Sequence, residues 1–461
     1  MSVNVNRRTF LGSLAAGAAL VPNLRADSSR GEGEYRRKIS FDYDVDVFVA
    51  GGGPAGVAAA VSAARHGKSV FLAEASGAFG GAATAALVPA FAQFTDGRRR
   101  VVGGIGWEIR SQVSRAIPES ATWTAINPEE LKRAYDKIVS ESGVRFSFFT
   151  NLCDVVAEGG KIRYAVLASK RGLFAVRAKV FVDCTGDGDL IAFAGGKFEK
   201  GDDEGSVMPP TLCSVWANID FENRRGEPAE SRLPQAVKDG VFTVPDLHLP
   251  GFFKTPGTNG IGGGNIGHVF GVDPTDERSL TSAMVDARKR LPEYERFYKT
   301  YLGGYEKMDL VATAPYLGVR ESRRIVCDYM LNVGDFVRRA DFEDGIGRYC
   351  YPVDVHNSKP GDAKAFEAFK KEYEKDLCYK KGESYGIPFR SLVPVSFSNA
   401  LVAGRCIGTD RKMQASVRVM PGAFITGQAA GTAAALAAAG DVRRIDAGDL
   451  RAALKEDGVV L

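Results

Sequence analysis

Three glycines near the start of the chain are spaced as G-x-G-x-x-G. Gly51, Gly53 and Gly56 enclose Pro54 and Ala55, and they lie between a short apolar run and an Ala-rich segment. In this pattern the first glycine permits a tight turn, the second lets the backbone approach a pyrophosphate, and the third lets a helix and a strand pack closely. Free N–H groups at the start of the helix face the phosphates. We therefore predict that these five residues bind a dinucleotide.

The elements needed to position these glycines follow in the expected order. Residues 47–50 are predicted to form a buried strand, 55–64 a helix and 70–73 a second strand, with Glu74 at its end. Glu74 stands 18 residues after Gly56, and its carboxylate can accept hydrogen bonds from a ribose hydroxyl. Because strand, helix, second strand and acid all occur in order, the sequence predicts a Rossmann-like α/β fold.

A second stretch matches the same glycine pattern but lacks its surroundings. Gly262, Gly264 and Gly267 follow turn-forming residues at 254–259, and residues 268–274 have no helical pattern. We therefore predict a flexible loop here, within a region that binds the substrate.

The composition is that of a soluble globular protein, with 45% hydrophobic and 25% charged residues. The formal net charge is +4, but three arginines lie among residues 1–26. The 60 basic residues less these three leave 57 against 56 acidic ones, which does not favour a nucleic-acid partner. Four scattered histidines, and cysteines without any C-x-x-C pair, predict no metal site.

The first 26 residues resemble a twin-arginine export signal. Residues 7–11 read Arg-Arg-Thr-Phe-Leu, and the apolar run at 14–21 is too short to span a bilayer. We expect export to the periplasm, with no membrane span. The alternative is a disordered basic N-terminus. Residues 27–40, with mixed charge, Ser and Gly, are interpreted as a linker.

Two segments of similar character flank a different one. Residues 41–200 are α/β, and residues 396–445 return to this character with an Ala-, Gly- and Thr-rich helix. Residues 201–395 are richer in Pro, charge and aromatic residues and lack βαβ units, which indicates an α+β substrate or cap domain. The dinucleotide-binding domain is thus predicted to be discontinuous, with 446–461 as a C-terminal tail.

Five blocks resemble FAD-dependent oxidoreductases of the glutathione-reductase-like superfamily. More closely, they resemble the family that includes the flavoprotein subunit of heterodisulfide reductase. The blocks are 51–56 with Glu74, 79–81, 184–190, 318–325, and 403–407 with 418–422 and 427–431. The resemblance implies an FAD-dependent oxidoreductase with FAD as its cofactor.

The resemblance also implies roles for individual residues. Gly51, Gly53 and Gly56 would hold the pyrophosphate and Glu74 the adenosine ribose. Further cofactor contacts are implied for Gly80, Gly81, Thr84, Thr185, Gly186, Gly404, Arg405 and the helix that starts near Gly422. Many relatives have an acid where Arg405 stands. The redox cysteine pair of the disulfide reductases is absent, and no second dinucleotide motif indicates direct use of NAD(P)H.

The substrate-side candidates are less specific. Arg320 and Arg323 belong to a run of three arginines in five residues, which can hold an anion bidentately or form a structural salt-bridge hub. His268 can act as an acid or base, or be structural. The predicted function is flavin-mediated hydride transfer with a small organic substrate and an unidentified electron donor or acceptor. The alternative is a non-redox exported carbohydrate-binding or lyase protein on a flavoprotein scaffold.

Overall fold

The computed structural model describes residues 36–113, 118, 121–224, 228–437 and 440–461. The predicted export signal, residues 1–26, lies outside this range, as does most of the predicted linker. Residues Ile39–Leu461 form one unit, and the description below concerns this unit. Among the described residues, no helix combines the length and apolar character needed to cross a membrane.

The main sheet has a parallel half and an antiparallel half. Strands β5, β2, β1 and β8 lie parallel in that order, and β7 and β6 continue the sheet antiparallel. Their bounds are β1 (Ser40–Ala50), β2 (Val70–Ala73), β5 (Arg145–Ser147), β6 (Asn151–Glu158), β7 (Lys161–Ser169) and β8 (Gly172–Asp183). The last residues of β1 and all of β2 are buried, as expected for parallel strands covered on both faces. Helix α1 (Pro54–Arg65) connects β1 to β2, so the predicted α/β unit is confirmed.

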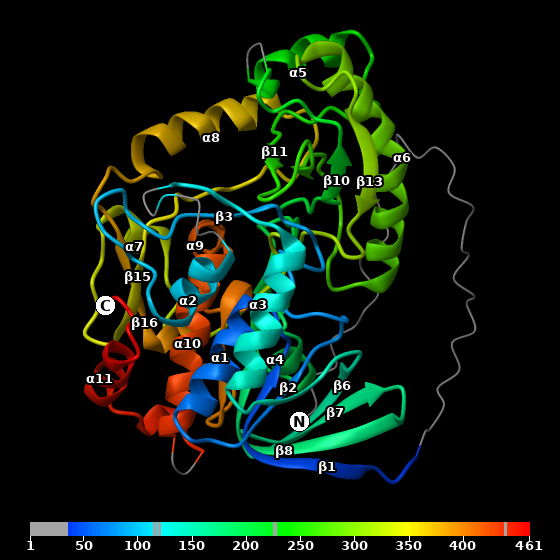
Figure 1. Ribbon diagram of the computed structural model, residues 1–461. Helices are drawn as coiled ribbons and strands as arrows, with labels where there is room; N and C mark the ends of the chain where they lie inside the picture. Colours follow the sequence, from blue (N-terminus) through cyan, green and yellow to red (C-terminus); the bar gives the residue numbers. More distant parts are fainter. Residues whose placement is uncertain (1–35, 114–117, 119–120, 225–227, 438–439) are drawn as a thin grey trace. The chain divides into compact units, whose positions relative to one another are not determined.

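The C-terminal part of the chain completes this layer, as predicted. Strand β17 (Ala400–Val402) pairs in parallel with the end of β8, and helix α10 (Met420–Leu436) lies beside α1 (Figure 1). The two helices touch through small residues. A Cβ on Gly427 would lie 2.2 Å from the carbonyl oxygen of Ala55, and one on Gly431 would lie 2.1 Å from that of Ala59. Only glycine allows the helices to approach this closely.

A second sheet lies at the opposite end of the unit from the main sheet (Figure 1). Its four strands run β11 (Gly251–Lys254), β12 (Gly262–Asn265), β10 (Ser214–Ala217), β13 (Asp309–Thr313) and are antiparallel. Helices α5 (Ala229–Lys238) and α6 (Glu277–Tyr301) share a hydrophobic core with this sheet. Trp216, Phe252 and Tyr298 belong to its own hydrophobic core, separate from that of the main sheet.

The prediction of a flexible loop at 262–267 was wrong for its first residues, which form β12. The glycines of this strand are covered by rings. A Cβ on Gly263 would lie 2.5 Å from Pro89, and one on Gly264 would lie 2.9 Å from the ring of Phe252. Neighbouring side chains therefore specify this strand, although its own residues have little preference for one.

The remaining elements surround these two sheets. They are α2 (Gly104–Val113), α3 (Pro128–Glu141), α4 (Asp189–Phe193), α7 (Val333–Val337), α8 (Ala363–Asp376), α9 (Arg411–Val417) and α11 (Ala447–Glu456), with strands β3 (Ala90–Phe91), β4 (Thr124–Ala125), β9 (Phe198–Lys200), β14 (Arg323–Ile325), β15 (Gly345–Tyr349) and β16 (Tyr385–Pro388). From Ile325 to Val393, most of the buried hydrophobic residues belong to the core of the main sheet. The second half of the predicted cap thus packs with the α/β layer.

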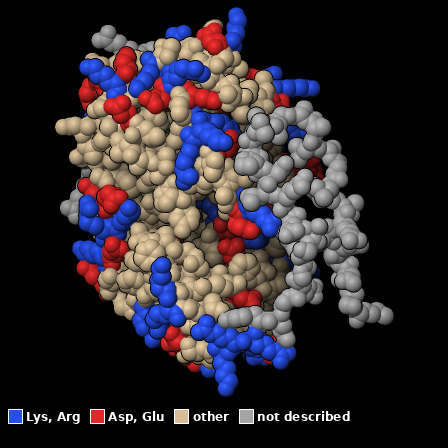
Figure 2. Space-filling view, turned by 90° about the vertical axis from the view of Figure 1, so that its right-hand side faces the viewer, with Lys and Arg blue, Asp and Glu red and all other residues tan. Residues whose placement is uncertain are grey.

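Acidic and basic side chains are mixed on the face drawn in Figure 2. They lie at its upper and lower parts, along its left edge and in a hollow near the centre, with both signs side by side, and the areas between consist mostly of other residues. This distribution agrees with the near balance of charges in the sequence.

Candidate active site

A cavity of about 710 Å³ opens where the parallel strands of the main sheet end. Residues that follow β1, β2, β8 and β17 all line it, which is where open α/β sheets bind their ligands. Ten of the predicted cofactor residues lie in its wall: Gly51, Gly53, Pro54, Ala55, Glu74, Gly81, Thr185, Gly186, Gly404 and Arg405. We call these ten residues the cradle.

The three glycines of the G-x-G-x-x-G pattern differ in the space around them. Gly51 has a φ of +92°, which is suited to glycine, and a Cβ on Gly56 would lie only 1.8 Å from the carbonyl oxygen of Gly51. Gly56 does not line the cavity but sets the contact of α1 with the preceding turn. By contrast, a Cβ on Gly53 would meet no protein atom within 4 Å. The space in front of Gly53 is therefore open to a ligand.

Glu74 is held in place by the backbone. Its side chain is buried, Oε2 accepts a hydrogen bond from the Gly52 N–H at 2.6 Å, and Oε1 accepts one from the Ser76 N–H at 2.7 Å. A carboxylate has further lone pairs, so a sugar hydroxyl can still donate to it from the cavity. The two backbone bonds fix the orientation of this acceptor before any ligand arrives.

Three other predicted cofactor residues shape the loops behind the cradle. The Gly80 N–H donates to the Gly52 carbonyl at 2.8 Å, and Thr84 Oγ1 donates to the Phe79 carbonyl at 2.6 Å. Gly422 lies in the first turn of α10, where a Cβ would be 2.3 Å from the Val417 carbonyl oxygen. These residues do not line the cavity themselves.

The start of α10 faces the cavity. Val419, Met420 and Ala423 line it, so the N–H groups of the first turn lie at its edge. The positive end of a helix dipole stabilises negative charge, typically by about 0.3–1 kcal/mol. A bound group that becomes anionic on reduction is favoured at this position.

Arg405 joins three segments at the cavity wall. Its guanidinium donates to the carbonyl of Gly186 at 2.9 Å, to the carbonyl of Val319 at 2.7 Å and to Asp187 Oδ1 at 2.6 Å. Arg405, at a position where many relatives have an acid, is therefore held by hydrogen bonds to other protein groups.

Arg320 lines the cavity opposite the cradle. It is buried, and its guanidinium donates to the Pro209 carbonyl at 2.9 Å, to Thr211 Oγ1 at 2.9 Å and to Asn265 Oδ1 at 3.1 Å. All three acceptors are neutral, and within the described residues Arg320 makes no ion pair. Burial and the neighbouring positive charge of Arg418 lower the pKa of Arg320 to about 10. Because its hydrogen-bond partners are all neutral, the guanidinium can still attract an anionic group of a ligand in the cavity.

Arg323 lies away from the cavity. Its guanidinium donates to Asp189 Oδ1 at 2.6 Å and to the Asp187 carbonyl at 3.1 Å. Arg324, the next residue, donates to the buried Glu321 at 2.7 Å. The sequence allowed two roles for these arginines, anion binding or a salt-bridge hub. Arg320 faces the cavity and fits the first role, whereas Arg323 and Arg324 form ion pairs and fit the second.

His268 is buried behind the cavity wall rather than in it. Its Nδ1 lies 2.9 Å from Asp246 Oδ1, and its Nε2 lies 2.8 Å from Nδ1 of His356. Burial lowers the pKa of His268. The histidines that line the cavity are His248 and His356, and the structure therefore does not bring His268 to the place expected from the sequence.

Four side chains of the cavity wall were missed as candidates. These are His248, Asp354, His356 and Arg418, which together with Arg320 we call the polar wall. Arg418 donates to Asp354 Oδ2 at 3.3 Å, and its buried Nε has no hydrogen-bond partner within the described residues. Only Arg418 belongs to a block that carried the family resemblance. Asp354 and His356 lie in one segment and His248 in another, so no local spacing joins all three.

These features fit FAD. The open space at Gly53 suits a pyrophosphate, the fixed carboxylate of Glu74 suits a ribose, and the start of α10 suits the flavin ring. The cavity also continues from the cradle to the polar wall, so a substrate can lie beside a bound flavin.

A comparison with protein-family models agrees with this fit. A protein-family model described as FAD dependent oxidoreductase matches residues 46–454. A geranylgeranyl bacteriochlorophyll reductase-like structure from Thermoplasma acidophilum is 12% identical, with 90% of this chain and 82% of that chain covered and a TM-score of 0.43. The p-nitrophenol 4-monooxygenase PnpA from Pseudomonas putida DLL-E4 is 15% identical, with 62% and 70% covered and a TM-score of 0.35. No curated protein matches the sequence. The match over most of the chain shows that the protein belongs to the family of FAD-dependent oxidoreductases.

Proposed function

We propose that the enzyme transfers a hydride between its flavin and a small organic substrate that carries an anionic group, such as a carboxylate. The observation that carries this proposal is Arg320, a buried guanidinium that faces the cavity and has only neutral partners. Binding an anion there would compensate a charge that is otherwise costly to bury.

Each side of the cavity has its own task in this proposal. The cradle binds FAD, with its pyrophosphate at Gly51–Gly56 and its adenosine ribose at Glu74, and bound FAD supplies the two-electron chemistry. Arg320 holds the anionic group of the substrate, and the unpartnered Nε–H of Arg418 supplies a further donor. Because His268 does not line the cavity, it is not placed to exchange a proton with the substrate.

The substrate class can be tested by anaerobic reduction of the bound flavin. Small carboxylic acids with an oxidisable C–H bond should bleach the flavin absorbance, whereas the matched methyl esters should do so more slowly. Arg320→Ala should weaken acid binding by about 10- to 150-fold, because a hydrogen bond to a charged group contributes about 1.5–3 kcal/mol. Equal rates for acids and esters would contradict an anion site.

Arg323→Ala is the matched control. It removes a guanidinium from the same run of sequence, but one that binds Asp189 and lies outside the cavity. We expect FAD binding and flavin reduction to stay close to those of the wild type. If Arg323→Ala slows reduction as much as Arg320→Ala, then Arg320 acts through the fold and not on the substrate.

We also propose export by the twin-arginine route and kinship with the flavoprotein subunit of heterodisulfide reductase. The support is in the sequence alone: the Arg7-Arg8 motif for the first and the five blocks for the second. Replacing Arg7 and Arg8 together by Lys should retain the protein in the cytoplasm, as measured by fractionation. Unchanged export of this double variant would refute the route.

A further inference from the structure

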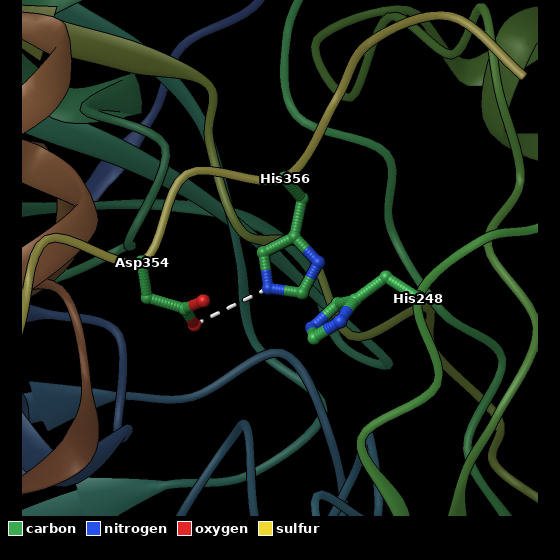
Figure 3. Close-up of side chains that lie close together, drawn as sticks. All are labelled: His248, Asp354 and His356. Carbon is green, nitrogen blue, oxygen red and sulfur yellow. Dashed lines mark hydrogen bonds and ion pairs between the residues drawn. The ribbon is translucent and has the colours of Figure 1, made fainter. Parts of the chain in front are cut away.

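Three of the four histidines in the chain come together at the cap side of the cavity. His248 and His356 lie beside Asp354, and the atoms that each can offer to a metal ion all lie within 4.8 Å of one another. Figure 3 shows both rings directed toward the same space next to the carboxylate, with His356 Nε2 3.2 Å from Asp354 Oδ2. We propose that these three residues bind a divalent transition-metal ion.

Both imidazoles have the outer hydrogen bonds that metal-binding histidines need. His248 Nδ1 lies 2.7 Å from Glu230 Oε1, which leaves its Nε2 for the metal. His356 Nδ1 lies 2.8 Å from His268 Nε2, and His268 Nδ1 in turn lies 2.9 Å from Asp246. A carboxylate therefore orients each ring, in one case directly and in the other through His268. Such partners fix the tautomer and ring direction of metal ligands.

The hydrogen-bond chain beside the site lacks one proton when both of its imidazoles are neutral. Asp246, His268, His356 and Asp354 make three successive contacts, and each needs one proton. Two neutral imidazoles supply only two, because each ring carries a single N–H. A second proton on one imidazole removes this deficit, and so does a metal ion between His356 Nε2 and Asp354. With the metal ion bound, His356 Nδ1–H donates to His268, and His268 Nδ1–H donates to Asp246.

Asp354 offers one of its carboxylate oxygens to a cation. The hydrogen bonds to Asp354 from Tyr351, His356 and Arg418 all end on Oδ2. Its Oδ1 accepts none from the described residues and can coordinate an ion.

Two imidazoles and one carboxylate are a ligand set for Zn²⁺ or Fe²⁺ with open coordination positions. The three residues line both the cofactor cavity and a second cavity of about 700 Å³, so small ligands can reach those positions from either side. The proposal goes beyond hydride transfer: it adds an ion that can bind an oxygen atom of the substrate next to Arg320.

Metal binding can be measured without any substrate. The FAD-loaded protein is dialysed against a chelator, freed of it and titrated calorimetrically with Zn²⁺, with metal content measured by mass spectrometry. We expect about one Zn²⁺ per chain with a Kd of about 1 μM or lower. His248→Ala and His356→Gln should each raise the Kd at least about tenfold. Flavin absorbance checks that the variants remain folded.

His66→Ala is the matched control, because His66 also pairs with a carboxylate, Asp457, but lies far from the polar wall. It should bind Zn²⁺ like the wild type. Absence of binding to the wild type would overturn the proposal and indicate a protonated histidine pair instead. Unchanged binding by both ligand variants would also overturn it. If His356→Gln no longer binds FAD, the Zn²⁺ affinity of His248→Ala alone tests the proposal, because His248 is only half-buried. None of these readouts depends on turnover, so the metal and hydride-transfer proposals fail separately.

Discussion

On one side of the cavity the chain presents backbone and very small residues, and on the other it presents charged side chains. The glycines in and beneath the cradle depend on the absence of side chains: a Cβ on Gly51 would lie 2.6 Å from the Cys184 carbonyl oxygen, and one on Gly56, which supports the cradle, would lie 1.8 Å from that of Gly51. The polar wall depends on the presence of Arg320, Asp354, His356 and their neighbours. We infer that substitutions that enlarge a side chain impair stability or binding at the cradle. At the polar wall and the second sheet, substitutions that truncate a side chain do so.

The largest effect is expected for Gly56→Ala. Its Cβ would lie 1.8 Å from the Gly51 carbonyl oxygen, and neither the turn nor α1 can move without opening the contact with α10. We expect a loss of more than about 4 kcal/mol in the free energy of unfolding and no FAD binding. Chemical denaturation and flavin absorbance measure both. A Gly56→Ala protein that is stable and binds FAD would contradict the inference that added side-chain atoms are not tolerated here.

Trp216→Ala tests the opposite side by removal. Trp216 is fully buried in the core of the second sheet, and its Nε1–H donates to Ser214 Oγ at 2.7 Å. We expect the free energy of unfolding to fall by about 3–5 kcal/mol, while the folded protein still binds FAD. The core of the second sheet is separate from that of the main sheet. If FAD affinity also falls, the stability of the second sheet and the binding of FAD are coupled.

Glu74→Ala removes the carboxylate of the cradle. It deletes the acceptor for a ribose hydroxyl and leaves the N–H groups of Gly52 and Ser76 without their partner. We expect the FAD Kd to rise about 10- to 150-fold, equivalent to about 1.5–3 kcal/mol, in a protein that still folds. Equilibrium titration with FAD provides the measurement. An unchanged Kd would mean that the ribose is bound elsewhere.

Gly53→Ala should have the smallest effect on the protein and a selective one on the ligand. A Cβ here meets no protein atom within 4 Å, so the free energy of unfolding should change by less than about 1 kcal/mol. The methyl group occupies the space in front of the phosphate site, and FAD affinity should fall about tenfold or more. Full FAD affinity in this variant would place the pyrophosphate away from Gly53.

The part of the cradle from Gly51 to Glu74 was predictable from spacing because its residues are neighbours in the chain, whereas Thr185, Gly186, Gly404 and Arg405 came from the family resemblance. The glycines, α1 and Glu74 lie within one βαβ unit, and each residue type has a local steric or hydrogen-bonding reason. Strand β12 was missed because the rings that cover its glycines are contributed by other segments. The polar wall was missed for a similar reason: His248 and His356 are more than 100 positions apart and meet only in the folded protein.

The close contact between α1 and α10 has a consequence for biosynthesis. Helix α1 ends at Arg65, but its partner begins only at Met420, so a ribosome adds about 350 residues before the two can meet. At about 5–20 residues per second, this takes tens of seconds. During that time the nascent chain has neither β17 nor α10, and the apolar surface of α1 lacks its cover. FAD can therefore be captured in its final site only after translation is nearly complete, and a chain terminated before residue 420 has no route to the native cofactor domain.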